Sequence, residues 1–251
     1  MAGKLIGIGV GPGDPELLTV KAVKALRMAD VVSVPKAHSD VSSLALGAVR
    51  QILEDRQDPP ELLELVFPMT KDKSEIERVM ARNASAVADR IDRGKVVAFI
   101  TLGDPMFYST FVYLFEAMRR HYPGVEIEII PGVTSLTACA ATARLPLAER
   151  EEVVAVIPSE VDKCEVEEIS RHADSMVFMK CARRFKELVT VLKRSPFEKS
   201  TVAIVRRCSM PEERVVVGEV AEAEGWELPD DYFSMMIVKR RDAEKERGDV
   251  V

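Results

Sequence analysis

The chain has 251 residues, and its 41 acidic against 35 basic side chains give a formal net charge of −6. Hydrophobic residues make up 47% of the sequence and charged residues 30%, which is typical of a folded globular protein and excludes a mainly disordered chain. The longest uncharged stretch, residues 129–143, is shorter than the roughly 20 apolar residues of a membrane span, so we expect no membrane partner. The acidic balance also argues against a nucleic-acid partner.

The cysteines indicate in which compartment the protein is expected. They stand at positions 139, 164, 181 and 208, with no C-x-x-C pair among them. Because the start of the chain lacks the long apolar run of a secretory signal, we expect reduced, buried thiols and a cytoplasmic protein. No H-E-x-x-H pair or similar motif is present, so we expect no metal site.

In the first half, apolar β-rich runs alternate with helical patterns. The sequence predicts strands at residues 5–10, 31–34, 62–67, 96–101 and 126–130, and helices at residues 16–28, 42–54, 74–93 and 108–121. In the third helix the apolar residues recur every three or four positions, which leaves the charges on the opposite face. Short strands that are buried on both faces and joined by helices predict a largely parallel sheet.

The pattern changes after residue 130. Strands are predicted at residues 153–157, 176–180, 201–205, 214–218 and 233–238, with only two substantial helices, at 134–143 and 182–194. The last two strands leave no room for a long helix between them, which favours antiparallel pairing. The sequence therefore predicts an α/β protein of two α/β domains. Residues 1–130 carry a mostly parallel sheet, residues 131–241 a mixed sheet, and residues 242–251 form a charged tail.

A glycine-rich loop at residues 7–15 (GIGVGPGDP) follows the first strand and opens a helix. It does not fit the dinucleotide pattern G-x-G-x-x-G, because Pro12 and Asp14 stand where the last glycine is required. Asp14 and Glu16 would also repel a phosphate at the helix N-terminus. The common methyltransferase loop needs an acidic residue where Leu5 stands. Taken alone, the loop is equally well explained as a tight turn with Asp14 as helix cap.

Two further turns lie at strand ends, where open α/β sheets bind their ligands. Residues 101–110 (TLGDPMFYST) contain a Gly-Asp-Pro turn, which lets the backbone approach a ligand and holds Asp104 beside it. Residues 130–137 (IPGVTSLT) bring hydroxyl groups into the start of a helix. Each turn can also be an ordinary helix start, with Asp104, Thr134 or Ser135 as the cap.

Taken together and in this order, the three loops resemble those of the tetrapyrrole methylases, which methylate intermediates of cobalamin and sirohaem synthesis and include diphthine synthase. The resemblance begins at residues 9–22 (GVGPGDPELLTVKA) and continues, more weakly, through residues 177–179, residues 207–215 and the final strand. Within the family, residues 103–114 (GDPMFYSTFVYL) are most similar to the precorrin-2 or cobalt-factor II C20-methyltransferases. The uroporphyrinogen-III enzymes usually continue with a Phe-Gly-Arg-Gly-type segment.

The resemblance implies an enzyme of cobalamin (vitamin B12) biosynthesis that methylates C20 of precorrin-2 or cobalt-factor II. Its donor would be S-adenosyl-L-methionine and its product S-adenosyl-L-homocysteine. The resemblance also implies a homodimer, with an active-site cleft between the two domains of each subunit. Two alternatives remain open: a tetrapyrrole methylase for another ring position, such as a uroporphyrinogen-III or precorrin-4 methyltransferase, and a non-enzymatic nucleotide-binding regulatory module.

The matching positions imply the site residues. The donor is expected against Val10, Gly103, Asp104, Met106, Phe107, Thr134 and Ser135 in the loops, and against Met179, Cys208, Ser234 and Met235 in the second domain. The substrate carboxylates need polar partners, for which the candidates are Lys21, Lys36, His38, Ser109, Thr110, Arg206 and Arg207. Each of these cations could instead be a solvated surface charge. Asp14 and Tyr108 are the expected acid, base or hydrogen-bonding groups at the macrocycle, although Tyr108 could instead pack in the core.

Overall fold

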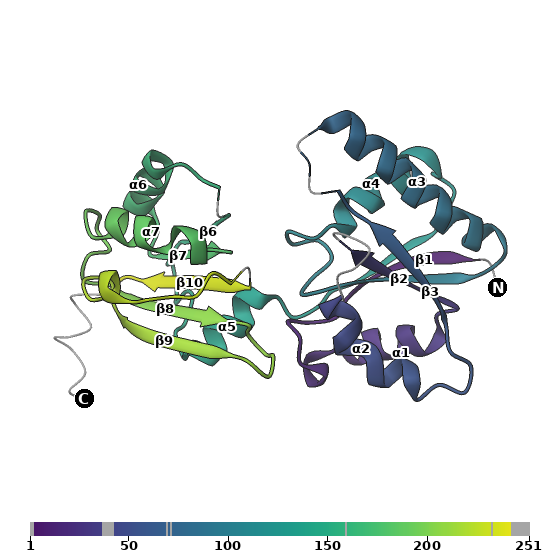
Figure 1. The fold of residues 1–251 in the computed structure, drawn as a ribbon, viewed down its shortest axis with the longest axis horizontal. Helices are drawn as coiled ribbons and strands as arrows, with labels where there is room; N and C mark the ends of the chain where they lie inside the picture. The colour runs from purple at the N-terminus through teal and green to yellow at the C-terminus, as the bar shows by residue number, and fades with distance from the viewer. Residues whose placement is uncertain are drawn as a thin grey trace. The chain divides into compact units, whose positions relative to one another are not determined.

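The computed structural model describes residues 3–36, 43–68, 70, 72–158, 160–231 and 233–241. They form two compact units that divide after Ser135, called here the N-terminal and the C-terminal unit (Figure 1). The boundary predicted from the sequence, after residue 130, lies slightly earlier. The intervening segment belongs to the N-terminal unit because the backbone N–H of Gly132 donates to Asp104 Oδ2 at 3.0 Å.

The N-terminal unit contains a five-stranded sheet in the order β3-β2-β4-β1-β5, and every neighbouring pair is parallel. The strands are β1 (Lys4–Gly9), β2 (Val31–Lys36), β3 (Glu61–Val66), β4 (Val96–Thr101) and β5 (Ile127–Ile130). The helices are η1 (Pro15–Leu17), α1 (Val20–Met28), α2 (Leu44–Glu54), α3 (Lys73–Asp92) and α4 (Phe111–His121). The predicted parallel sheet is confirmed.

Helices cover both faces of this sheet (Figure 1). Helices α1 and α2 pack on one face, where Leu26 and Val49 are fully buried against the strands. Helices α3 and α4 pack on the other, where the tilted rings of Phe99 of β4 and Phe111 of α4 meet with centroids 5.4 Å apart. Because neither face meets water at the centre of the sheet, β1 and β4 are nearly continuous apolar runs, whereas the edge strands β3 and β5 carry glutamates.

The C-terminal unit contains a five-stranded sheet in the order β6-β7-β10-β8-β9. Strands β6 (Val154–Ile157) and β7 (Ser175–Met179) pair in parallel, whereas β10 (Ser234–Lys239) runs antiparallel to β7 and to β8 (Thr201–Arg206). Strand β9 (Arg214–Glu219) completes the sheet antiparallel to β8. The helices are α5 (Ser135–Ala143), α6 (Lys163–His172), η2 (Ala182–Arg184), α7 (Phe185–Leu192) and η3 (Ala223–Gly225). The predicted mixed sheet is confirmed.

Helix α6 corrects the expectation of only two substantial helices in this half of the chain. It buries only Val166 and Ser170, so its sequence lacks the apolar repeat that identifies a helix. The start signal was nevertheless present: the Asp162 carboxylate accepts the backbone N–H of Cys164 at 2.8 Å as the N-cap.

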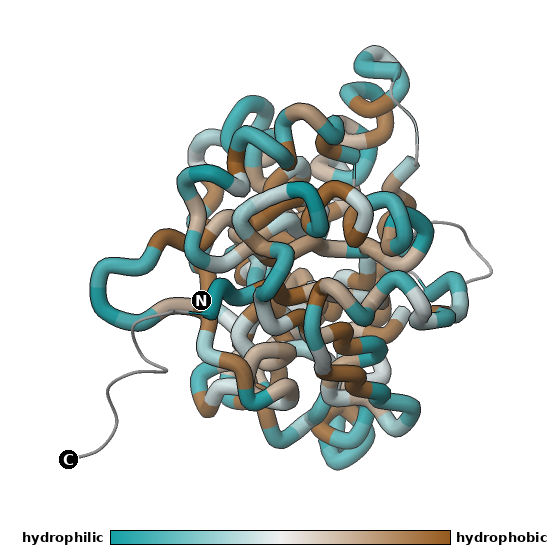
Figure 2. Tube along the Cα trace, turned by 90° about the vertical axis from the view of Figure 1, so that its left-hand side faces the viewer, coloured by the Kyte–Doolittle hydropathy of each residue, from teal (hydrophilic) through white to brown (hydrophobic). Residues whose placement is uncertain are grey.

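The core of the C-terminal unit contains Phe178 of β7 and Phe185 of α7, both buried. Trp226 stacks on the Phe185 ring with centroids 6.2 Å apart. In Figure 2, hydrophobic and hydrophilic segments alternate along the trace. Within the described ranges, every helix is too short or too polar to cross a bilayer.

Candidate functional site

The three loops singled out in the sequence meet at the carboxyl ends of β1, β4 and β5, which are neighbours in the sheet. Gly11 and Gly103 exchange backbone hydrogen bonds, with N···O distances of 3.3 and 2.7 Å. A Cβ atom on Gly132 would lie 2.2 Å from the Gly103 carbonyl oxygen and 2.8 Å from Gly9 Cα. Such contacts are impossible for any side chain, so these glycines allow the three backbones to pack directly against one another.

Asp104 holds two of the loops together. Its Oδ1 accepts the backbone N–H of Met106 at 2.8 Å, and its Oδ2 accepts that of Gly132 at 3.0 Å. Both oxygens therefore bind the protein's own backbone. A charge-assisted bond of this kind is strong, which makes Asp104 a support for the loop geometry.

Gly103 is buried but has room for a side-chain atom. This residue has φ +72°, and a Cβ added there would meet only the backbone nitrogen of Ser135, at 4.0 Å. Met106 is exposed, and Phe107, Thr134 and Ser135 are partly exposed around the same loops. These loops therefore combine room beside the Gly103 backbone with side chains that keep exposed surface.

Val10 differs from the other loop positions. It has no exposed surface, and its side chain packs in the core shared with α1 and α2. Its backbone N–H donates to the Thr101 carbonyl at 2.9 Å. The Val10 side chain thus anchors the glycine loop in the core, and none of its surface is exposed to a ligand.

Tyr108 does not pack in the core, so the alternative of a purely structural core tyrosine is excluded. It is 58% exposed, and its ring meets that of Phe107 edge-on with centroids 4.9 Å apart. Its φ of +51° lies in the left-handed region, which is unfavourable for a bulky side chain. Strained residues of this kind cluster at binding and catalytic sites.

The neighbouring polar candidates have different environments. Asp14 caps η1, because its Oδ1 accepts the Glu16 N–H at 2.8 Å, and it remains partly exposed. Ser109 is buried: its hydroxyl lies 2.8 Å from Thr101 Oγ1 and accepts the Phe111 N–H at 3.1 Å. The Ser109 hydroxyl is therefore hydrogen-bonded inside the fold, and a substrate contact at this residue stays a prediction. Thr110 is partly exposed ahead of α4 and makes no capping bond.

Two candidate cations of the N-terminal unit are ion-paired. Lys21 Nζ lies 2.7 Å from Glu128, and Lys36 Nζ lies 2.6 Å from Glu64. Hydrogen bonds from Lys21 and Lys4 lower the pKa of Glu128 below its ordinary value. The Lys21 side chain is 63% exposed, and such surface pairs are weak enough to exchange for another anion. His38 lies outside the described residues.

In the C-terminal unit, β7 and β8 end beside the start of β10. Lys180 and Arg207 follow these strands with φ values of +55° and +47°, and their N–H groups donate to Ser234 and Phe233 at 2.7 and 2.8 Å. The Ser234 hydroxyl accepts the Ala182 N–H at 3.0 Å. These bonds bring together the positions of this unit that were expected to contact the methyl donor. Met179 is partly exposed there, while Cys208, Ser234 and Met235 are buried.

Asp231 binds three groups at the same strand ends. The sequence analysis did not identify it as a site residue. It accepts Arg206 Nη2 at 3.1 Å, Arg207 Nε at 2.9 Å and the Phe233 N–H at 3.0 Å. Burial acts to raise the pKa of Asp231, but the hydrogen bonds hold it below its ordinary value. Both predicted arginines therefore serve this carboxylate. The only sequence signal was an acidic residue just before the last strand.

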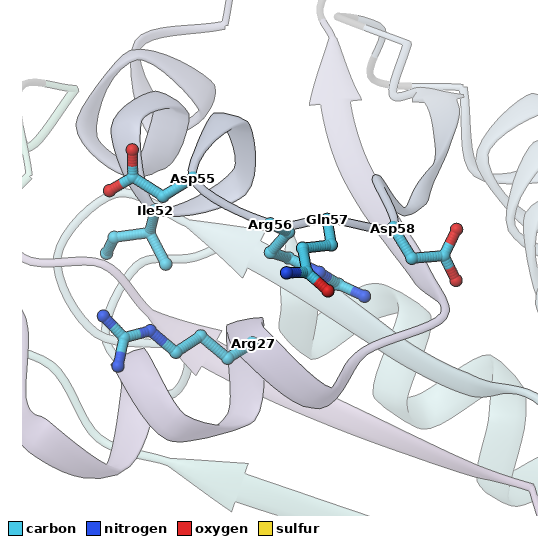
Figure 3. Close-up of a pocket in the computed structure, with 6 residues that line it drawn as sticks. All are labelled: Arg27, Ile52, Asp55, Arg56, Gln57 and Asp58. Atoms are coloured by element: carbon cyan, nitrogen blue, oxygen red, sulfur yellow. The ribbon is translucent and has the colours of Figure 1, made fainter.

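A separate pocket of about 400 Å³ lies in the N-terminal unit where α1 and α2 end, and Arg27, Asp55 and Arg56 line part of it (Figure 3). Arg56 Nη1 donates to the carbonyls of Leu26 and Ala29 at 2.9 and 2.7 Å. These are terminal carbonyls of α1, which otherwise have no partner in the helix. The pocket lies near the amino ends of β2 and β3, away from the glycine loops, and its chemistry is explained by this capping.

Known proteins resemble the chain over nearly its whole length. The family model of the Tetrapyrrole (Corrin/Porphyrin) Methylases matches residues 4–224. The cobalt-precorrin-2 C(20)-methyltransferase of Salmonella typhimurium is 34% identical over 245 residues, covering 96% of this chain and 98% of that protein. A solved cobalt precorrin-4 methyltransferase is 26% identical with a TM-score of 0.72, and the match covers 94% of each chain. A uroporphyrin-III C-methyl transferase from Thermus thermophilus, solved with S-adenyl homocysteine, is 27% identical with a TM-score of 0.64, and covers 94% of this chain and 97% of that one.

Proposed function

Since this chain belongs to the tetrapyrrole (corrin/porphyrin) methylases, we propose that it transfers a methyl group from S-adenosylmethionine to C20 of precorrin-2 or cobalt-factor II in cobalamin biosynthesis. The observation that carries the proposal is the convergence of three glycine-containing loops, which pack backbone to backbone at Gly103. The 34% identity to a cobalt-precorrin-2 C(20)-methyltransferase, over nearly both full lengths, supports the choice of substrate and carbon.

S-adenosylmethionine supplies a methyl group on a positively charged sulfonium. The residues around Gly103 suit such a donor: Met106 and Phe107 offer apolar contact, and Thr134 and Ser135 offer hydroxyl groups. Asp104 acts on the loops and not on the sulfonium. Transfer removes the sulfonium charge, so a fixed anion against it would stabilise the ground state more than the transition state. The further donor contacts that we propose are Met179, Cys208, Ser234 and Met235.

The acceptor carbon of a reduced tetrapyrrole is electron-rich and can attack without prior loss of a proton, so positioning is the enzyme's largest contribution. The exposed ring of Tyr108 offers a flat apolar surface for the macrocycle, and its hydroxyl can bind a pyrrole nitrogen or a carboxylate. Lys21 and Thr110 are the candidate partners of substrate carboxylates. Asp14 is partly exposed and has a second carboxylate oxygen with which to accept the proton released afterwards.

We further propose a homodimer, as the family resemblance implies, and a cytoplasmic protein, in line with its scattered cysteines. Light scattering at micromolar concentration should give about 56 kDa, twice the chain mass of 27.9 kDa. A mass equal to that of the single chain would reject the dimer and leave the proposed reaction untouched.

Methyl transfer tests the function itself. The purified protein is incubated with S-adenosylmethionine that carries an isotopically labelled methyl group, together with precorrin-2 or cobalt-factor II. Mass spectrometry should find one labelled methyl per macrocycle. Tyr108→Ala should lower the rate by roughly tenfold or more, whereas Tyr113→Ala, an exposed tyrosine on α4, serves as the matched control and should not.

Calorimetric titration with S-adenosylhomocysteine separates the possible failures. Binding without transfer to either macrocycle would reject the substrate. Absence of binding would reject the methyltransferase itself.

A further inference from the structure

The base of the Gly-Asp-Pro loop contains two buried hydroxyl groups. Thr101 is the last residue of β4 and is 5% exposed, and Ser109 lies just before α4 and is 9% exposed. Thr101 Oγ1 lies 2.8 Å from Ser109 Oγ, and either atom can be the donor. This contact, called here the hydroxyl pair, ties the chain that leaves β4 to the chain that enters α4, and so closes the loop of residues 102–108.

The Ser109 hydroxyl makes a second bond, which begins α4. It accepts the backbone N–H of Phe111, the first residue of the helix, at 3.1 Å. The first N–H groups of a helix have no partner inside it, and Thr110 at the cap position makes no side-chain capping bond. A hydroxyl has one proton and two lone pairs, so Ser109 can serve Phe111 and Thr101 together. The hydroxyl pair thus fixes the residue at which the loop ends.

Tyr108 is the residue directly before this fixed point. Its φ is +51°, and a bulky residue in the left-handed region is strained. Such strain persists only where the surrounding structure holds it. The tyrosine is 58% exposed and its ring meets Phe107 edge-on, so the packing of its side chain gives little restraint. The restraint on its backbone must therefore come from the bonds next to it, which are those of Ser109.

Other bonds hold the front of the same loop. Asp104 accepts the backbone N–H groups of Met106 and Gly132 at 2.8 and 3.0 Å. These bonds lie in the part of the loop where the methyl donor is expected, and they do not involve the hydroxyl pair. The donor part of the loop and the part that carries Tyr108 are therefore held by separate bonds.

We propose that Thr101 and Ser109 are positioning residues for methyl transfer, because their hydroxyl pair holds Tyr108 in the left-handed conformation that presents its ring to the macrocycle. This role rests on the proposed function, in which the tyrosine ring binds the tetrapyrrole. Without the hydroxyl pair, Tyr108 relaxes to a negative φ, which turns the Cα–Cβ bond and carries the ring to a different place. Transfer then becomes slower while the donor binds as before.

The first test needs neither donor nor substrate. The chain contains four tyrosines, so NMR of protein labelled with ¹³C-tyrosine gives few signals, and Tyr108→Phe identifies the signal of Tyr108 by its loss. The Cα chemical shift depends on φ and ψ. Thr101→Val keeps the shape of the side chain but removes its hydroxyl, and it should move the Tyr108 Cα signal to the range of ordinary negative φ. Thr101→Ser keeps the hydroxyl and should leave the signal in place.

Two further variants complete this test. Ser109→Ala removes the hydroxyl pair from the other side and should move the Tyr108 signal in the same way, which keeps the test open should Thr101→Val not fold. Ser170→Ala is the control, because Ser170 on α6 is 1% exposed and its hydroxyl donates to the Glu167 carbonyl at 2.6 Å. It removes a buried serine hydroxyl from the C-terminal unit and should leave the signal unchanged. A Tyr108 signal that stays at its wild-type position in both Thr101→Val and Ser109→Ala would overturn the proposal.

A double-mutant cycle on the rate then tests whether Thr101 acts through Tyr108. Thr101→Val should lower kcat/KM for precorrin-2 or cobalt-factor II by roughly tenfold, because a small misplacement of a positioning group is costly. Thr101→Ser should restore the rate, and Ser170→Ala should not change it. In the Tyr108→Ala background, Thr101→Val should cause no further loss, since the ring that it positions is absent. An equal further loss in that background would overturn the proposal.

Calorimetry with S-adenosylhomocysteine separates positioning of the tyrosine from support of the whole loop. Thr101→Val should bind with wild-type affinity, because the bonds of Asp104 are intact. Weaker binding would overturn the separate action of the hydroxyl pair on Tyr108. A wild-type protein that transfers no methyl group would reject the proposed function, whereas the shift of the Tyr108 signal would still establish that the hydroxyl pair holds its backbone.

Discussion

At the scale of single residues, the most informative feature is the backbone of Tyr108. A large aromatic residue in the left-handed region costs about 1–2 kcal/mol relative to ordinary backbone geometry. This tyrosine buries little of its surface in return, since it is 58% exposed. Its conformation is therefore not explained by stability, and a role of the ring beside the macrocycle, as proposed above, would account for it.

Replacing Tyr108 with glycine separates the effect of the strained backbone on stability from the effect of the ring on methyl transfer. Tyr108→Gly removes the backbone strain but adds freedom to the unfolded chain, so the free energy of unfolding should stay within about 1 kcal/mol of wild type. The rate of methyl transfer should nevertheless fall by roughly tenfold or more, because the ring is gone. Arg150→Gly, at an exposed residue with φ +49°, is the matched control and should leave the rate unchanged. Full activity in Tyr108→Gly would mean that the strained tyrosine has no part in catalysis.

At the scale of elements, the site depends on three loops that touch backbone to backbone. Gly132→Ala would push a methyl group onto the Gly103 carbonyl, and overpacking of this kind costs about 1–3 kcal/mol. We expect a lower free energy of unfolding, measured with urea and circular dichroism, together with weaker S-adenosylhomocysteine binding. Gly47→Ala on α2 is the control: nothing lies within 4 Å, so it should stabilise the protein by about 0.5–1 kcal/mol without changing affinity. Wild-type affinity in Gly132→Ala would dissociate the loop junction from donor binding.

The strand ends of the C-terminal unit should respond to acid through Asp231. Its pKa is lowered in the folded protein, so its stabilising contribution is complete above the ordinary carboxyl value of about 3.9 and is lost as the pH falls through the lower, folded value. Asp231→Asn should therefore be less stable than wild type at neutral pH, and the difference should shrink below about pH 4. Unfolding of this unit can be followed by the fluorescence of Trp226, the single tryptophan. A difference that stays constant down to the lowest pH would show that the carboxylate charge is not what stabilises these strand ends.

Most elements could be predicted from the sequence because their signals are local. Strands β1 and β4 are nearly continuous apolar runs, and α3 has an apolar face over Lys73–Asp92. Helix α6 escaped detection because it buries so little apolar surface. The helix predicted at residues 16–28 is divided after η1, where Thr19 caps α1 by accepting the Ala22 N–H at 3.1 Å.

At the scale of the whole molecule, only those parts of the candidate site that lie in a contiguous sequence motif could be predicted. The three loops were found because their glycine patterns are contiguous in the sequence. The ion-pair partners of the lysines and arginines were not found, because these pairs join residues far apart in the chain. Examples are Lys21 with Glu128 and Arg207 with Asp231. Contacts of this kind depend on which strands become neighbours, and the order β6-β7-β10-β8-β9 leaves no local signal.

The position of the transferred methyl group tests the central claim most directly. The tetrapyrrole methylated by this protein, with an isotopically labelled methyl from S-adenosylmethionine, can be examined by NMR to identify the carbon that carries the label. We expect the label on C20 of precorrin-2 or cobalt-factor II, and nowhere else on the ring. A label on any other carbon would contradict the assignment as a C20-methyltransferase, even if the protein proved to be an active methylase.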